Sequence, residues 1–454
     1  MNQSHIPQAR PLGGWAVRAM ASRSIRFWLL AVLAIALAVR LAAILAIDNP
    51  QKVPRTLAES DAPTYYVLAE NMLDGTGYRY AADQPPTAKR TPGYPLLLAS
   101  VFKVFGRSFN AVRGVQCALD LATTYLVFAL TVLVFGSVAG GLLAALGYAL
   151  YPPAILSSTY VMTETTYTFL LVLAVVAATL AIRARSYILY AVSGIVLGLS
   201  TLTRPGAFLL PAALLVVGLL VSRGVSSGLG TSVGRVLGKG ATEHIERGVW
   251  NGLVVLIIAF LVTLLPWAAR NQHALGKFIP TSTLMGANLY NGNHLGTQGA
   301  YFWSTDSLLT PDLRAQLSGA DEVGRDRILQ IAARKMILAN KGAIAILTLK
   351  KIPRLWLNLG YGRASSKKSL ALASFHLVLI ALGVCGLLGL TRETKVLSFF
   401  PLTTVVFSSI MYLAVATEVR FVFPLVPLVL PYSAVGLLRL LESLAGGKMI
   451  GARP

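Results

Sequence analysis

Two acidic residues stand where an enzyme could use them. Asp61 precedes a segment whose apolar residues recur at helical spacing, so it sits at the start of an expected short helix. A carboxylate there can cap the helix, and it can also stay ionised and oriented as a general base for an acceptor hydroxyl or amine. Glu164 opens an apolar run, either as a first-turn acid that complements the helix dipole or as a second acid on the same membrane face.

Four arginines could hold an anion near these acids. Arg90 begins a segment with two prolines, residues 90–95. We expect this segment to be a stiff, non-helical turn in which Gly93 permits a close backbone approach. Arg204, Arg270 and Arg420 each lie where an apolar run meets the same face. A boundary arginine is commonly an anchor among lipid head groups, whereas its planar fork can also grip a phosphate with two hydrogen bonds.

Three further features carry weaker signals. A polar, glycine-rich stretch with Asn288, Tyr290 and Asn293 is expected to be a turn-rich loop that suits hydrogen bonding to a sugar, without the spacing of a nucleotide site. Asp120 lies inside an apolar run and is expected to have a structural partner, such as a buried arginine or hydroxyl. Residues 325–360 are predicted to form basic amphipathic helices on the membrane plane.

The composition places these residues in a membrane protein. The 454 residues are 55% hydrophobic and 13% charged, against roughly 25% charged in a soluble domain. The formal net charge is +22, but the basic residues lie between apolar runs rather than on a surface suited to nucleic acid, so no nucleic-acid partner is expected. Cys117 and Cys385, the two cysteines, both lie in apolar runs, which excludes a disulfide framework or a thiolate zinc cluster.

We predict an all-α integral membrane protein of about ten spans, because the sequence repeatedly supplies the roughly 20 apolar residues that cross a bilayer. The expected spans are 27–47, 111–135, 138–156, 164–182, 187–202, 205–222, 249–268, 371–390, 396–416 and 421–441. Arginines before the first span place the N-terminus in the cytoplasm. Cytoplasmic tails 1–26 and 442–454 then flank a polytopic domain, 27–441, whose external loops 48–110 and 269–370 carry amphipathic juxtamembrane helices.

In order and spacing, these features resemble the GT-C glycosyltransferases, specifically the bacterial group related to the lipid A aminoarabinose transferase and the protein O-mannosyltransferases (glycosyltransferase families 39 and 83). The resemblance covers nearly the whole chain. It is carried by Asp61, Tyr65, Tyr66, Ala69, Asn71, Gly75, Gly77, residues 90–95, 163–165, 203–205, 267–271 and 288–293, and by Arg420, Phe421, Pro424 and Pro427.

The resemblance implies a GT-C-like helical bundle that moves a sugar from a polyprenyl-phosphate carrier, such as undecaprenyl phosphate, to a glycolipid such as lipid A, a polysaccharide or a protein. The expected location is a bacterial inner membrane, surrounded by its lipids, with the active site on the periplasmic side. A polytopic transporter or flippase for a lipid-linked sugar is the alternative, although no inverted repeat is visible. A non-catalytic membrane scaffold is the third class.

The resemblance also implies residue roles. Asp61 matches the catalytic base, Glu164 a second acid and Arg90 the contact to the carrier phosphate. The substrate-binding set adds Tyr65, Arg204, Arg270, Asn288, Tyr290, Asn293 and Arg420. In some relatives the second acid helps to organise the donor or a divalent cation. Here Asp61 is followed by Ala62 and Glu164 has no acidic neighbour, so a metal stays undecided and no other cofactor is expected.

Overall fold

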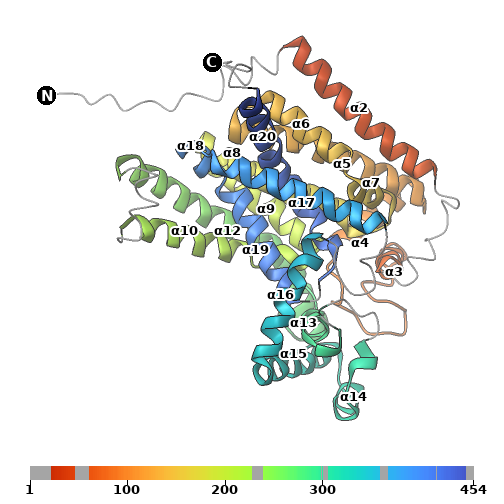
Figure 1. Cartoon of the computed structure of the whole chain (residues 1–454). Helices are drawn as coiled ribbons and strands as arrows, with labels where there is room; N and C mark the ends of the chain where they lie inside the picture. The colour runs from red at the N-terminus through yellow and green to blue at the C-terminus, as the bar shows by residue number, and fades with distance from the viewer. Residues whose placement is uncertain are drawn as a thin grey trace.

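The computed structural model describes residues 22–46, 61–226, 239–297, 299, 305–357, 367–415 and 417–445, and these residues are mostly helical (Figure 1). The first half contains α2 (Arg23–Leu45), α3 (Ala62–Leu73), α4 (Gly93–Phe105), α5 (Phe109–Phe135), α6 (Val138–Ala149), α7 (Pro152–Thr159), α8 (Thr163–Ala184), α9 (Tyr187–Thr203), η2 (Pro205–Ala207) and α10 (Leu210–Ser226). The second half contains α12 (Lys239–Leu275), α13 (Met285–Asn293), η3 (Leu295–Thr297), η4 (Thr305–Leu308), α14 (Pro311–Ser318), α15 (Glu322–Ala339), α16 (Lys341–Leu357), α17 (Lys367–Leu388), α18 (Arg392–Leu397), α19 (Phe399–Ala414), η5 (Val419–Phe421), η6 (Phe423–Leu425) and α20 (Val426–Leu444).

The membrane-protein prediction is confirmed, but the predicted number of spans is not. Within the described residues, 6 helices are long and apolar enough to cross a bilayer, and 7 spans result if the pair α6 and α7, bent by 52°, counts as one. Each remaining predicted span falls on a shorter apolar helix: α9 and α10 have 17 residues each and α19 has 16. Most of the predicted tails, residues 1–21 and 446–454, and part of each predicted external loop, including 48–60 and 358–366, lie outside the described residues.

A large apolar core lies among the helices of the bundle, and the polar helices collect at one end of it. The largest cluster of buried side chains draws on α5, α8, α9, α12, α19 and α20. In Figure 1, α13, α14, α15 and α16 gather at one end of the bundle. There α13 and α15 share a smaller core around Tyr290 and Leu329. The two amphipathic helices expected in residues 325–360 are α15 and α16.

Two segments differ locally from the sequence prediction. The expected non-helical turn at residues 90–95 ends early, because α4 already begins at Gly93. Pro95 fits in the first helical turn, where a backbone N–H would have no partner inside the helix. The close approach predicted for Gly93 is confirmed, since a Cβ added there would lie 2.8 Å from backbone atoms of Leu202 and Thr203.

The second difference is the polar stretch 288–293, which is not a turn-rich loop but part of α13. The helix start is stabilised from outside, because the Gly286 N–H donates to Asp326 Oδ1 on α15 at 2.6 Å. A cap supplied from 40 residues away leaves no local sequence signal, which is why the glycines and asparagines indicated a loop.

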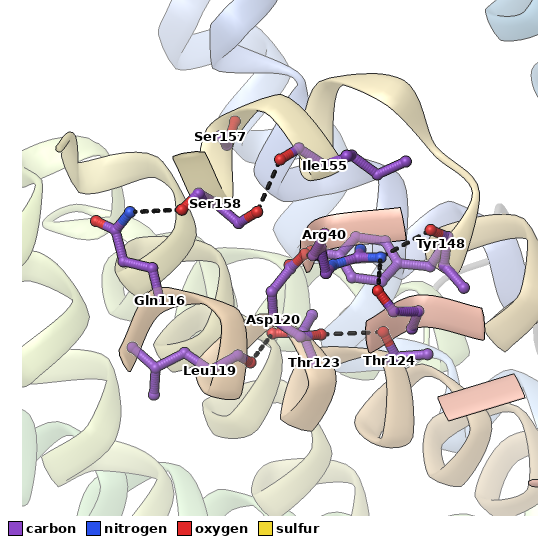
Figure 2. A network of polar contacts seen from close by, with 12 residues as sticks. Arg40, Gln116, Leu119, Asp120, Thr123, Thr124, Tyr148, Ile155, Ser157 and Ser158 are labelled. Carbon is purple, nitrogen blue, oxygen red and sulfur yellow. Dashed lines mark hydrogen bonds and ion pairs between the residues drawn. The ribbon is translucent and has the colours of Figure 1, made fainter. Parts of the chain in front are cut away.

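Asp120 has the structural partner that its position predicts (Figure 2). Arg40 Nε lies 2.5 Å from Asp120 Oδ2, and the Tyr148 hydroxyl donates to Asp120 Oδ1 at 2.5 Å. Arg40 Nη1 also donates to the Ala149 carbonyl at 2.8 Å. Both charged side chains are fully enclosed. The network therefore joins α2 to α5 and α6, and the buried charges neutralise each other where neither could be solvated.

Breaking this pair on one side is expected to destabilise the protein strongly. Asp120→Ala leaves Arg40 buried without a counter-charge, which costs about 3–5 kcal/mol. The measurement is the free energy of unfolding of the purified protein in detergent. The double variant Arg40→Met with Asp120→Leu removes both charges and should recover most of the loss. An Asp120→Ala protein as stable as wild type would contradict a stabilising role for this ion pair.

Candidate active site

Asp61 occupies the N-cap position of α3, but its side chain makes no cap hydrogen bond. Its carboxylate instead accepts a hydrogen bond from Arg90 Nη2 through Oδ1. Arg420 Nη1 lies 3.7 Å from the other oxygen, Oδ2. The Thr64 N–H donates to the Asp61 carbonyl at 3.1 Å and Pro63 has no N–H, so neither of these two positions needs the carboxylate as a cap. The acid is thus directed at two guanidinium groups rather than at its own helix.

Glu164 is the first-turn acid of α8 that the sequence predicts, and it is also paired. Arg204 Nη1 donates to Glu164 Oε1 at 2.9 Å, and Arg420 Nη1 lies 3.9 Å from the same oxygen. Glu418 completes the group, because its Oε2 lies 2.7 Å from Arg420 Nε. Arg420 therefore bridges Asp61 and Glu164, which come from segments more than 100 residues apart along the chain.

A cavity of about 230 Å³ opens at this cluster. Six residues singled out from the sequence line it: Asp61, Tyr65, Arg90, Arg204, Asn288 and Arg420. Arg90 Cζ lies 5.3 Å from the centre of the Tyr65 ring, and Arg204 Cζ lies 4.8 Å from that of Phe421. The aromatic faces thus fix the planes of two guanidinium groups beside the cavity.

The other sequence-predicted residues have different surroundings. Arg270 donates to the carbonyl oxygens of Thr87 at 2.8 Å and Tyr78 at 3.0 Å. The Tyr290 hydroxyl donates to the Leu308 carbonyl at 3.1 Å. Asn293 donates to the Ala414 carbonyl at 2.9 Å. None of the three lines the cavity beside Asp61.

Some residues at the site were not singled out from the sequence. Lys89 and Asn291 line the cavity, and Glu418 pairs with Arg420. Asn291 follows Asn288 by three residues, a spacing that places both on one face of a helix. Had the segment been identified as helical, Asn291 would have been found together with Asn288. Lys89 adjoins Arg90, and Glu418 lies two residues before Arg420, but closeness in sequence alone does not indicate a shared site.

The electrostatic environment keeps Asp61 ionised. Burial raises the pKa of the Asp61 carboxyl, but the positive charges of Arg90, Arg420 and Arg204 outweigh it, so the net shift is below the usual value of 3.8. An ionised Asp61 is therefore expected at any pH at which cells grow.

The acids of this cluster do not form a metal site. Within the described residues, no group of three His, Cys, Asp or Glu side chains could hold an ion. Asp61 and Glu164 both face arginines, whose positive charge opposes a cation in the same space. The donor set therefore does not fit a tightly held divalent cation.

A second, larger cavity of about 620 Å³ adjoins the first. It is enclosed by α13, α14 and α15, and it shares Lys89, Leu284 and Ala287 with the smaller one. Its wall also carries charged side chains, namely Arg314, Arg325, Glu322 and Asp326. The Asp61 cluster thus lies next to a second space, lined in part by charged side chains, among the helices at the end of the bundle.

Comparison with known proteins identifies the fold. Residues 89–235, less than half of the chain, match the family described as dolichyl-phosphate-mannose-protein mannosyltransferase. No curated protein sequence matches the chain. The archaeal oligosaccharyltransferase AglB from Archaeoglobus fulgidus, solved with an inhibitory peptide and a dolichol-phosphate, superimposes with a TM-score of 0.51 at 15% identity. That alignment covers 95% of this chain and 53% of AglB.

Two further structures are similar. The Archaeoglobus fulgidus oligosaccharyltransferase tethered to an acceptor peptide gives a TM-score of 0.50 at 16% identity, over 94% of this chain and 52% of that one. ArnT from Cupriavidus metallidurans, bound to undecaprenyl phosphate, gives a TM-score of 0.41 at 14% identity, over 94% of this chain and 82% of that one. This chain spans about half the length of the oligosaccharyltransferase, with which it shares a fold over nearly all of its own length.

Proposed function

We propose that this chain, which has the fold of the GT-C glycosyltransferases, transfers a sugar from a polyprenyl-phosphate carrier to an acceptor. The observation that carries the proposal is the Asp61 cluster: an ionised carboxylate and three arginines, Arg90, Arg204 and Arg420, around one cavity. A base and fixed cations are the two components that displacement of a phosphate by a hydroxyl or amine requires.

In this mechanism the acceptor oxygen or nitrogen attacks the anomeric carbon of the donor. The new bond to the acceptor forms as the bond between the anomeric carbon and the phosphate oxygen breaks, and the electron pair leaves with the carrier phosphate. The acceptor proton passes to the Asp61 carboxylate. Arg90 and Arg420 stabilise the charge that develops on the phosphate, since both lie against Asp61. Arg204 holds Glu164, which keeps Arg420 between the two acids.

The two cavities suggest how the two substrates reach one site. An apolar polyprenyl tail needs the lipid or a groove between helices, whereas a polar acceptor needs water. The cavity of about 620 Å³ is lined by charged and hydroxyl side chains together with four leucines, and its wall includes Lys89, the neighbour of Arg90. We assign it to the acceptor. The transporter alternative is less well supported, because Asp61 precedes a 12-residue helix that is not among the candidate spans.

Cells that lack the protein are expected to lose one sugar from one class of envelope molecule. Mass spectrometry of glycolipids, polysaccharides and glycoproteins from cells with and without the gene would identify that sugar and its acceptor together. Restoring wild type should return the modification, and restoring Asp61→Asn should not. Identical glycan profiles in all three strains would contradict sugar transfer.

The external helices α13 to α16 are proposed to lie on the periplasmic face of a bacterial inner membrane. Gln316, exposed on α14, offers a labelling position in a Cys385→Ser background, which leaves only the buried Cys117. Gln316→Cys should react with a membrane-impermeant maleimide in intact cells. Ala184→Cys, at the predicted cytoplasmic end of α8, should react only after lysis. The reverse pattern would invert the orientation.

A further inference from the structure

The segment that carries Arg90 has no regular secondary structure, although its neighbours are buried. Thr87, Ala88 and Thr91 are at most 3% exposed. Arg90 can face Asp61 reproducibly only if other groups hold this stretch, because fixing each backbone residue in one conformation costs conformational entropy. The structure shows which groups hold it.

Glu322, at the start of α15, provides the densest set of these contacts. Its Oε1 accepts hydrogen bonds from the Ala88 N–H at 2.8 Å and from the Thr283 hydroxyl at 2.6 Å. Its Oε2 accepts from the Thr87 hydroxyl at 2.6 Å. The Thr283 N–H in turn donates to the Ala88 carbonyl at 3.1 Å. One carboxylate therefore joins residues 87–88 to two segments about 200 residues further along the chain.

A simple helix-start role does not account for Glu322. An acid in the first turn is favourable for any helix, and its side chain often caps the free N–H groups. Here that task belongs to Asp321, whose side chain accepts from the Gly324 N–H at 2.6 Å. The Glu322 carboxylate points instead at the Arg90 segment. Arg270 supports the same segment from the other side through the Thr87 carbonyl.

We propose that Glu322 is a positioning residue for sugar transfer: it fixes residues 87–88 so that Arg90, two residues further on, stays directed at Asp61 and the cavity. The proposal rests on the proposed function of the Asp61 site. It also gives α15 a role in that function, because the external helices then set the position of the phosphate-binding arginine. Charged hydrogen bonds of this kind are stronger and more directional than neutral ones.

The test compares Glu322→Ala and Glu322→Gln with Asp321→Ala, in protein purified into lipid nanodiscs. The Asp321 variant is a matched control, because it weakens the start of the same helix without touching residues 87–88. Hydrogen exchange of the backbone amides of residues 87–91 and the affinity for undecaprenyl phosphate are measured for each. Glu322→Ala should speed exchange at Ala88 at least tenfold and weaken undecaprenyl phosphate binding about tenfold. Asp321→Ala should change neither.

Glu322→Gln should be intermediate and keeps the test usable if the alanine variant fails to fold. One amide oxygen can still accept, but the amide nitrogen cannot accept the third hydrogen bond. If the amide of Ala88 exchanges at the wild-type rate in both Glu322 variants, Glu322 does not hold residues 87–88. Faster exchange with wild-type binding of undecaprenyl phosphate would overturn the positioning role. A wild-type protein that does not bind undecaprenyl phosphate would overturn the proposed function, and the exchange data would still decide whether Glu322 holds the segment.

Discussion

Replacing Asp61 with asparagine is expected to slow sugar transfer by about 10²- to 10⁴-fold, the contribution typical of a positioned general base. Asparagine keeps the size of the side chain and an oxygen that can accept from Arg90, but it cannot take the acceptor proton. Binding of the carrier phosphate should change little, because the cations remain in place. The loss should therefore appear in turnover rather than in donor affinity.

The acidity of Asp61 makes this expectation more specific. Arg90, Arg420 and Arg204 overcome the effect of burial and lower its pKa. A weakly basic carboxylate is always ionised but accepts a proton poorly. A phosphate bound by the same arginines would offset their charge, which would raise the pKa of Asp61 toward its usual value. We therefore expect Asp61 to become a better base when the donor binds, and any acid limb from this group in the free enzyme to lie lower in pH than that of an ordinary aspartate.

The measurement is single-turnover transfer together with undecaprenyl phosphate binding, for wild type and Asp61→Asn. Asp74 offers a matched control, since it follows the same helix and pairs with Arg107 at 2.7 Å, but it is exposed and lies away from the cavity. Asp74→Asn should transfer sugar at the wild-type rate. Turnover close to wild type in Asp61→Asn would remove Asp61 from the mechanism.

Features that follow from periodicity and charge could be predicted from the sequence. Apolar runs indicated the membrane helices, and the shared face assigned to Asp61, Glu164 and Arg204 agrees with their meeting at one cluster. The span count could not be predicted, because α9, α10 and α19 are apolar but only 16 or 17 residues long. An apolar run indicates that a segment avoids water, but it does not show that the segment is long enough to cross the bilayer.

Hydrogen bonds between side chains and backbone groups could not be predicted from the sequence. Arg270 resembles the other boundary arginines in sequence, but it donates to carbonyl oxygens of Tyr78 and Thr87, which every residue type possesses. Glu322 likewise accepts from the Ala88 N–H. Only the fold brings such groups together. Asp120 lies between these cases: its place in an apolar run predicted a structural partner such as a buried arginine or hydroxyl, but only the packing of α2 and α6 against α5 identifies Arg40 and Tyr148.

Arg90→Lys separates a phosphate ligand from a membrane anchor by chemistry rather than by position. An anchor needs only positive charge, so lysine would be nearly silent in that role. If the Arg90 guanidinium binds phosphate with two aligned hydrogen bonds, replacement by lysine removes one of them. This costs about 1.5–3 kcal/mol, which corresponds to a tenfold to hundredfold loss of affinity or rate. The lysine variant also loses the interaction between the Arg90 guanidinium and the face of the Tyr65 ring. We therefore expect Arg90→Lys to fold normally and to transfer sugar at least tenfold more slowly than wild type.

The kinetic form of the loss tests the mechanism further. If the hydrogen bonds to phosphate strengthen as its charge develops, Arg90→Lys should lower turnover as well as donor affinity. Arg107→Lys is the matched control, because Arg107 also pairs with a carboxylate but is 52% exposed and does not line the cavity. That variant should match wild type in both quantities. A wild-type rate in Arg90→Lys would leave Arg420 and Arg204 as the phosphate ligands, because these are the other two arginines among the residues that line the Asp61 cavity.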